Sequence, residues 1–404
     1  MKRGHLSEYF SGVAAKRLSA VEADTRRSNQ HEFNGVEGLK RLFGRAESKR
    51  TYPARFLYLN DHEGNPLIAD STLTWYDARA GHRTRSEHRL YFPANAVMDQ
   101  ARAGDLMVIG RRPDQSVLLI VAEYGSTVAS QVQWLFGTAT LPDAGYAVRD
   151  DLDSEHDRIA TASRFILEQI GVVIELPSDA HLDDMLRRFG GSFPNTRDFS
   201  AYARSKLPEV DSRADPDGAL LLYMEREESL FRTLERHLVG TRLEQGFVHD
   251  VDGFVAYSLT VHNRRKSRAG YALENHLDCI LSATGIRFSR TVVTENRSKP
   301  DFLFPGAAEY QDSQFSSHRL TVLGVKTTCK DRWRQVLAEA DRIPQKHLLT
   351  LEPAISTAQT DEMQSRNLKL VIPKPLHTSY SPTQQAAMLS LKDFVELVER
   401  RQNA

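Results

Sequence analysis

The sequence is poor in cysteine: Cys279 and Cys329 are the only two among 404 residues. Two cysteines cannot form a disulfide framework, and these two lack the spacing of a zinc site. They suit a reducing compartment, so we expect a cytoplasmic protein in which both are small, buried or half-buried side chains. None of the fourteen histidines has a spacing that predicts a metal site.

Long apolar runs and an excess of charge are also missing. No stretch approaches the roughly eighteen apolar residues of a membrane-spanning helix, and the N-terminus lacks the apolar segment of a secretory signal. The 53 basic and 53 acidic residues give a net charge of zero. This balance argues against nonspecific coating of nucleic acid, although phosphate contacts depend on local clusters of charge. No internal repeat is visible.

The composition, with 40% hydrophobic and 26% charged residues, is typical of a globular protein, and the length suffices for two or three domains. We predict an N-terminal domain over 1–175, a linker over 176–190 and a C-terminal domain over 191–404. Turn signals in the N-terminal domain separate short β-branched runs, which favours a small barrel. Its strands are expected at 54–59, 71–76, 106–109 and 117–122, after a short helix from Glu8 to Ala20.

The C-terminal domain alternates apolar strand-like runs with helical periodicity, which indicates an α/β sheet. Two helices are expected at 247–257 and 266–283. Strands are expected at 302–304, 320–326, 347–351 and 368–372, with a helix over 331–341 between the second and third.

Two residues in this domain carry the first chemical signal. Asp301 follows Pro300 at the head of the apolar run Phe302–Phe304, and Lys326 closes a β-branched strand. This pattern indicates the core of a metal-dependent nuclease. Such cores usually place an acid two residues before the lysine, but this position holds Gly324. Because a divalent cation needs at least two carboxylates, Asp301 alone would make a poor site.

Glu339 is the predicted second carboxylate. It lies on the helical segment after Lys326, on a stripe different from the apolar one, and could point toward the end of the Lys326 strand. The ordinary alternative is a strand with a buried lysine followed by a solvated helix. Glu274 lies beside the apolar stripe of the 266–283 helix, where it could support the metal ligands, hold a second metal, or be a surface acid.

Three long runs carry a family resemblance: NRRKSRAG at 263–270, KPDFLFP at 299–305 and VKTTCKDRWRQ at 325–335. The C-terminal half resembles the catalytic domain of the EcoRII restriction endonuclease family. The resemblance implies a restriction-endonuclease α/β fold that hydrolyses double-stranded DNA with Mg²⁺ at a CCWGG-like site, where W is A or T. Asp301 and Glu339 would hold the metal, with Lys326 beside the attacking water.

Two charged segments are expected to touch DNA. The first segment is the triplet Lys330, Asp331 and Arg332. Lysine and arginine can donate to guanine and aspartate can accept from cytosine, and the resemblance implies that this triplet reads the outer CC/GG pairs. A charged helix start is the alternative. Phosphate contacts are expected from Arg264, Arg265, Lys266 and Arg268. The resemblance also suggests Arg226 for a base-flipping pocket and leaves Tyr310 structural.

The N-terminal half carries weaker similarities. The stretches 8–20 and 76–89 resemble the effector-binding domain of the same family. This resemblance implies a B3-like β pseudobarrel that clamps a second, effector copy of DNA. The candidate effector contacts are Arg79, Arg83, Arg85, Glu87 and Arg89.

The sequence therefore predicts a type IIE restriction endonuclease, a homodimer that its N-terminal domain inhibits and a second DNA copy activates, with no membrane partner. One alternative is a repair or methyl-directed nuclease that shares the core. Another is a B3-type DNA-binding regulator with a silent nuclease domain. The presence of Asp301, Lys326 and Glu339 disfavours the silent domain.

Overall fold

The computed structural model describes residues 4–404 apart from 24–30, 47, 63–65, 83, 139, 158–160, 173, 175–180 and 330–331, and it leaves the side chains of 157, 161, 162, 165, 266 and 296 undescribed. The chain forms two compact units. The first comprises Met1–Ile174 with Ala354–Gln359, and the second comprises Glu175–Pro353 with Thr360–Ala404. No helix in the described part is long and apolar enough to cross a membrane.

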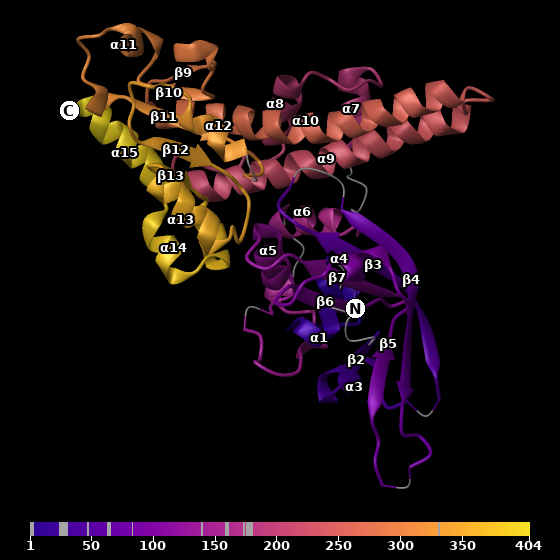
Figure 1. Ribbon diagram of the computed structural model, residues 1–404. Helices are drawn as coiled ribbons and strands as arrows, with labels where there is room; N and C mark the ends of the chain where they lie inside the picture. The colour runs from indigo at the N-terminus through magenta and orange to yellow at the C-terminus, as the bar shows by residue number, and fades with distance from the viewer. Residues whose placement is uncertain are drawn as a thin grey trace. The chain divides into compact units, whose positions relative to one another are not determined.

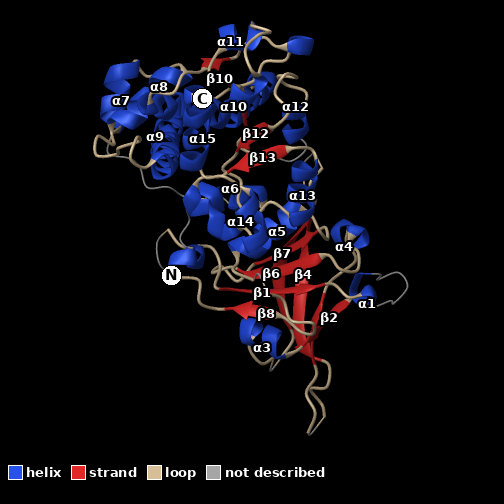
Figure 2. Ribbon diagram, turned by 90° about the vertical axis from the view of Figure 1, so that its left-hand side faces the viewer, coloured by secondary structure: helices blue, strands red, loops and turns tan. Residues whose placement is uncertain are grey.

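The first unit is built on an eight-stranded sheet, drawn in red in the lower part of Figure 2, with the order β2-β5-β4-β3-β7-β6-β1-β8. Neighbouring strands are antiparallel except for the parallel pair β3 and β7. The strands are β1 (Gly12–Arg17), β2 (Glu32–Gly35), β3 (Arg50–Leu59), β4 (Leu67–Asp77), β5 (His88–Tyr91), β6 (Leu106–Arg111), β7 (Val117–Ala122) and β8 (Ala147–Arg149). The helices are α1 (Ala20–Ala23), α3 (Glu37–Phe43), α4 (Ala96–Gln100), α5 (Thr127–Leu135) and α6 (Thr161–Gln169).

Both faces of this sheet are buried at its central strands β6 and β7. In β6, Leu106 and Val108 pack into one hydrophobic core, while Met107 and Ile109 pack into another on the opposite face. Successive strand residues point to opposite faces, so a strand covered on both sides must be apolar at every position. This explains why β6 and β7 read as continuous apolar runs. The curled sheet confirms the strand-rich prediction for this unit.

The helix expected from Glu8 to Ala20 is wrong. Gly12–Arg17 is instead strand β1, which pairs with β6 on one side and β8 on the other. Val13 and Ala15 face one core and Ala14 faces the other. Burial on both faces of a sheet outweighs the local helical preference of this alanine-containing stretch.

The second unit holds a five-stranded sheet with the order β13-β12-β11-β10-β9. β11, β12 and β13 are parallel to one another, whereas β10 is antiparallel to both of its neighbours. The strands are β9 (Ser289–Arg290), β10 (Phe302–Phe304), β11 (Thr321–Val325), β12 (Lys346–Leu349) and β13 (Leu368–Val371). The helices are α7 (Leu182–Phe189), α8 (Thr196–Ser205), α9 (Pro216–Gln245), α10 (Val251–Thr284), α11 (Ala307–Gln311), α12 (Trp333–Leu337), α13 (Thr357–Ser365), α14 (Pro382–Ala387) and α15 (Leu391–Asn403).

This mixed sheet with its helices confirms the predicted α/β class of the C-terminal half. The two helices expected at 247–257 and 266–283 are one continuous helix, α10, which lies beside α9 along much of its length (Figure 1). The N-cap Asp250 accepts a hydrogen bond from Gly253 N at 2.8 Å. The helix ends at Gly285, whose φ of +82° suits glycine at this position.

The range expected as a linker, 176–190, contains a folded helix where the structure describes it. In α7, Met185 is fully buried among Phe199, Leu230 and other apolar residues of α8 and α9. Leu182, Leu186 and Phe189 pack against the same cluster. This spacing of apolar residues makes one face of a helix, so α7 belongs to the helical layer of the second unit.

Candidate active site

Asp301 and Lys326 meet at the ends of two adjacent strands. Asp301 directly precedes β10, and Lys326 directly follows β11, which pairs antiparallel with β10. Lys326 Nζ donates to Asp301 Oδ2 at 3.1 Å, and Val325 N donates to the same oxygen at 2.6 Å. The side chains of Asp301 and Lys326 are only 15% and 13% exposed, so the carboxylate of Asp301 is held in a fixed orientation away from most solvent.

Close packing of α12 explains why Gly324 replaces the expected acid. A Cβ atom added at Gly324 would lie 2.6 Å from Val336 Cγ2 and 3.0 Å from Cγ1, both well inside normal contact. No carboxylate side chain fits on this position of β11 while α12 stays in place. The same packing brings the end of α12, and with it Glu339 two residues later, toward the end of the strand.

Glu339 is a half-buried residue whose carboxyl group lies beside another negative charge. Burial and the nearby charge of Asp301 raise the pKa of Glu339 to about 7, against a weaker opposing effect of Lys326. Its Oε2 atom is buried and has no hydrogen-bond partner among the described residues. A buried oxygen without a partner is costly unless a proton or a cation meets it.

Glu274 completes the group from the other side, on α10. Burial, and then the charge of Asp301, raise the pKa of Glu274. Arg290 Nη2 donates to Glu274 Oε2 at 2.9 Å and opposes this shift. We did not anticipate Arg290 from the sequence. It lies on the two-residue strand β9, and only the pairing of Arg290 with Phe302 on β10 brings it beside Asp301.

The chemistry of these ligands suits a hard divalent cation. Mg²⁺ prefers carboxylate oxygens and retains several waters, so one or two carboxylates with a phosphate are a sufficient set. Asp301 and Glu339 supply two carboxylates, and the unpartnered Oε2 of Glu339 offers a free ligand atom. No group of three or more histidine, cysteine, aspartate or glutamate side chains that could hold a metal occurs among the described residues.

Tyr310 supports the turn that carries Glu339. Burial raises the pKa of Tyr310, and the hydrogen bond that its hydroxyl donates to Glu295 raises this pKa further. Glu295 also accepts from Asp341 N at 3.3 Å, and Thr294 Oγ1 accepts from Ala340 N at 3.4 Å. These contacts fix the backbone just after Glu339, so a structural role for Tyr310 fits its surroundings.

The segment expected to read bases begins α12. Lys330 and Asp331 lie outside the described residues, while Arg332 is exposed at the N-cap position of the helix. Backbone groups on either side of the two undescribed residues are hydrogen-bonded: Cys329 N donates to the carboxylate of the buried Glu352, and Arg332 N donates to Cys329 O at 2.8 Å. Arg332 thus lies exposed at the start of α12, with its backbone N–H hydrogen-bonded to Cys329.

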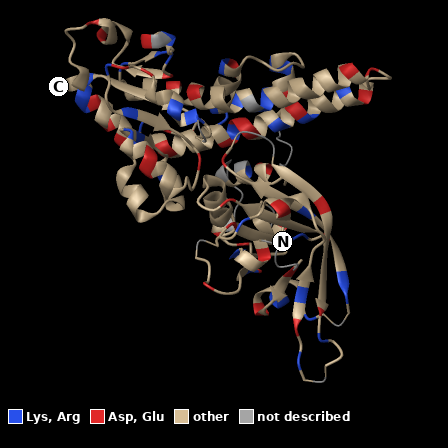
Figure 3. Cartoon of the chain, viewed as in Figure 1, with Lys and Arg blue, Asp and Glu red and all other residues tan. Residues whose placement is uncertain are grey.

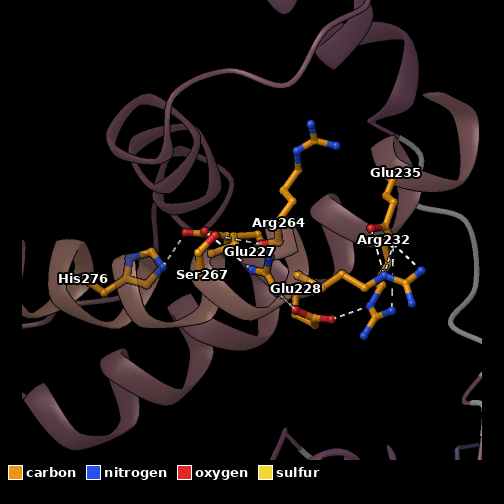
Figure 4. Close-up of polar contacts among 9 residues, drawn as sticks. Glu227, Glu228, Arg232, Glu235, Arg264, Ser267 and His276 are labelled. Atoms are coloured by element: carbon orange, nitrogen blue, oxygen red, sulfur yellow. Dashed lines mark hydrogen bonds and ion pairs between the residues drawn. The ribbon is translucent and has the colours of Figure 1, made fainter. Parts of the chain in front are cut away.

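Residues of both charges lie along α9 and α10 (Figure 3), and acids of α9 pair with some of the basic residues of α10 (Figure 4). Arg265 Nη2 lies 2.7 Å from Glu235, which is only 2% exposed. Arg268 is itself 7% exposed and pairs with Glu228 and, at 3.7 Å, with Glu227. Much of this charge therefore holds the two helices together.

Arg264 differs from these two residues. Its guanidinium lies 4.2 Å from the ring centre of Phe193 and points away from the acids in Figure 4. The side chain of Lys266 is outside the description. On α9, Nη2 of Arg226, the residue suggested for a base-flipping pocket, lies 3.2 Å from His181 Nδ1. Of the basic run, Arg264 has the environment that best suits a phosphate contact.

The candidate effector residues lie on the connection between β4 and β5, apart from Arg89, which lies in β5. Asp77 Oδ1 accepts hydrogen bonds from Arg79 N at 2.8 Å and Glu87 N at 2.7 Å, and these bonds lower the pKa of Asp77 to about 2. Glu87 pairs with Arg79 at 2.6 Å and with Arg89. Arg85 is exposed, and Arg83 lies outside the described residues. The connection is therefore held in a defined shape at its base.

Known proteins resemble the part of the chain that holds this site. Residues 231–395 match a protein-family model described as EcoRII C terminal. The type II restriction enzyme EcoRII of Escherichia coli is 42% identical over 221 residues, which cover 54% of this chain and 52% of the relative. The match thus spans about half the length of that relative.

Solved structures show a weaker likeness. A metal-depleted Ecl18kI in complex with uncleaved, modified DNA is 17% identical, with a TM-score of 0.46 over 57% of this chain and 86% of that chain. A PspGI–substrate DNA complex is 15% identical, with a TM-score of 0.45 over 52% and 94%. The sequence match is the stronger finding: residues 231–395, which carry Asp301, Lys326 and Glu339, are similar to the C-terminal part of EcoRII.

Proposed function

We propose that the protein is a type II site-specific deoxyribonuclease that hydrolyses phosphodiester bonds of double-stranded DNA in the presence of Mg²⁺. The observation that carries the proposal is the meeting of Asp301, Lys326 and Glu339 at one end of the sheet, with a carboxylate oxygen of Glu339 unpartnered among the described residues. The 42% identical relative is named a type II restriction enzyme, which supports the same activity.

The roles of the three residues follow from their surroundings. Asp301 and Glu339 would hold the cation, with the backbone carbonyl of Val325 as a further oxygen ligand. Bound there, the cation would supply Lewis-acid stabilisation of the leaving oxygen and a water of lowered pKa. Lys326, fixed by Asp301, donates toward the attacking water and offsets negative charge on the scissile phosphate.

The recognition site in this proposal is CCWGG-like. Arg332, with Lys330 and Asp331 before it, reads the outer G·C pairs, because arginine and lysine can donate to guanine and aspartate can accept from cytosine. The exposed position of Arg332 at the start of α12 supports this role. Arg264, with Lys266 two residues later, contacts phosphate, whereas Arg265 and Arg268 hold α10 against the acids of α9.

Regulation in this proposal rests on the first unit. This unit is taken as a B3-like pseudobarrel that inhibits cleavage until the β4–β5 connection, with Arg79, Arg83, Arg85, Glu87 and Arg89, binds a second DNA copy. The protein acts as a homodimer. Target and effector DNA then favour the same active state, so each should tighten the binding of the other.

Two experiments test the proposal. Asp301→Ala, Lys326→Ala and Glu339→Ala should each abolish cleavage of a site-bearing plasmid in Mg²⁺ while specific DNA binding remains. Wild-type cleavage by Glu339→Ala would refute the role of this carboxylate. For regulation, the full chain should cut a single-site plasmid slowly and faster when a short site-bearing duplex is added. If the duplex has no effect, activation by a second copy is wrong.

A DNA-binding regulator with a silent nuclease domain is the second candidate. It would bind the same DNA but leave every plasmid intact in Mg²⁺ or Mn²⁺. The preorganised Asp301 carboxylate and the unpartnered Glu339 oxygen favour a working site over a silent one.

A further inference from the structure

Arg290 is a cation beside the active site that the proposed mechanism does not use. It lies opposite Phe302 in the β9–β10 ladder, and Phe302 directly follows Asp301 in the chain. Its guanidinium lies 5.3 Å from the ring centre of Phe302. The side chain is 19% exposed, so this charge is largely removed from water.

Two acids of α10 face this guanidinium. Glu274 lies 2.9 Å from Nη2 and Asp278 lies 3.7 Å from Nη1. They are four residues apart and so lie on one face of the helix. Nε and Nη1 of Arg290 are buried without a hydrogen-bond partner among the described residues, so the guanidinium keeps unused donors toward its acidic neighbours.

The charges of the site can then be assigned in pairs. Lys326 is paired with Asp301 at 3.1 Å, and Arg290 is paired with Glu274 at 2.9 Å. Glu339 has no cation within ion-pair distance among the described residues, and one of its oxygens has no partner. The need for further positive charge is therefore concentrated at Glu339 and the adjacent Asp301.

The same arrangement decides the role of Glu274. Glu274 Oε2 already accepts from the buried Arg290 guanidinium, so the charge of this carboxylate is offset before any metal binds, and drawing it toward a cation would weaken its pair with Arg290.

We propose that the Arg290 guanidinium takes the place of a second metal ion, so that each chain binds one divalent cation, held by Asp301 and Glu339, while Glu274 holds Arg290. Arg290 and Glu274 are positioning residues in this scheme. The inference rests on the proposed nuclease function, because it assumes that Asp301 and Glu339 are the metal ligands. It adds the number of ions and the reason for that number.

Counting bound Mn²⁺ on the full chain without DNA tests the idea. Free Mn²⁺ is measured by electron paramagnetic resonance at about pH 8, where Glu339, with a pKa of about 7, is ionised. The wild type should bind one ion, and Arg290→Gln should bind two, because Glu274 is released. The double variant Arg290→Gln/Glu274→Gln should return to one. Two ions on the wild type, or one on Arg290→Gln, would overturn the inference.

Matched variants separate charge from folding. Arg290→Lys keeps a tethered cation and should bind one ion. Arg287→Gln removes the nearby Arg287–Glu309 ion pair, which is 2.7 Å long, and should also bind one. If Arg290→Gln does not fold, Glu274→Gln decides: it should still bind one ion, and binding none would make Glu274 a metal ligand and refute the inference.

The proposed metal site has its own control. The variant Asp301→Asn/Glu339→Gln should bind no ion above background. If it binds Mn²⁺ as the wild type does, the ligand assignment of the proposed function fails. If it binds none while Arg290→Gln stays at one ion, only the role of Arg290 fails.

Discussion

Adding one methyl group at Gly324 should damage both stability and catalysis. In Gly324→Ala the new Cβ would lie 2.6 Å from Val336 Cγ2, so α12 must move by about 1 Å to restore ordinary contact. Overpacking of this kind costs about 1–3 kcal/mol. The same shift carries Glu339 away from Asp301, and a displacement of about 1 Å in an active site can cost on the order of 100-fold in rate.

The assay compares thermal unfolding with plasmid cleavage. For a unit of this size, Tm should fall by about 2–4 °C per kcal/mol. Gly324→Ala/Val336→Ala removes both clashing methyl groups and should recover part of the rate. Gly270→Ala on α10, where an added Cβ meets nothing within 4 Å, is the matched control and should leave cleavage unchanged. Wild-type Tm and rate in Gly324→Ala would refute the packing argument.

Three further predictions concern other parts of the second unit. Burial lowers the pKa of His347 to about 3, so between pH 3 and the ordinary histidine pKa of about 6.5 this residue is protonated only in the unfolded chain. The free energy of unfolding should therefore fall as the pH drops, by about 2 kcal/mol at pH 5. Urea unfolding measured against pH should show a smaller pH dependence in His347→Gln. Arg268→Met should lower the free energy of unfolding by about 3–5 kcal/mol because Glu227 loses its cation, whereas Arg264→Ala should weaken all DNA binding and reduce its salt slope by about 1 at unchanged Tm. Arg332→Ala should lose about 1–3 kcal/mol of discrimination at one G·C pair, and an equal loss on random DNA would contradict base readout.

Local patterns in the sequence were sufficient for the centre of the second unit. The apolar run after Asp301 and the β-branched run before Lys326 are strands β10 and β11. Short buried strands can be recognised in a sequence by their apolar and β-branched residues. The missing acid at position 324 led to the prediction that Glu339 is the second carboxylate, and in the structure the half-buried Glu339 lies close enough to Asp301 for the charge of Asp301 to raise its pKa. The functional roles of these residues remain to be tested.

Features that depend on distant partners could not be predicted in this way. Strand β1 was expected to be helical because its alanines favour a helix locally, and only pairing with β6 and β8 makes it a strand. Arg290 gave no signal because β9 is two residues long and takes its position from β10. Arg268 was expected to face DNA phosphates; its burial against Glu227 and Glu228 depends on the approach of α9, which the local sequence of α10 does not reveal.

The first unit is made of two separate stretches of the chain, which has a consequence for its folding during synthesis on the ribosome. The unit ends its main stretch at Ile174 but also includes Ala354–Gln359. In it, Thr127 Oγ1 donates to Gln359 Oε1 at 2.6 Å and accepts from Ser356 N at 3.2 Å. At about 5–20 residues per second, the chain between Ile174 and Gln359 takes roughly 10–40 s to make. For that time the nascent first unit lacks its last segment, so the two units cannot mature strictly one after the other.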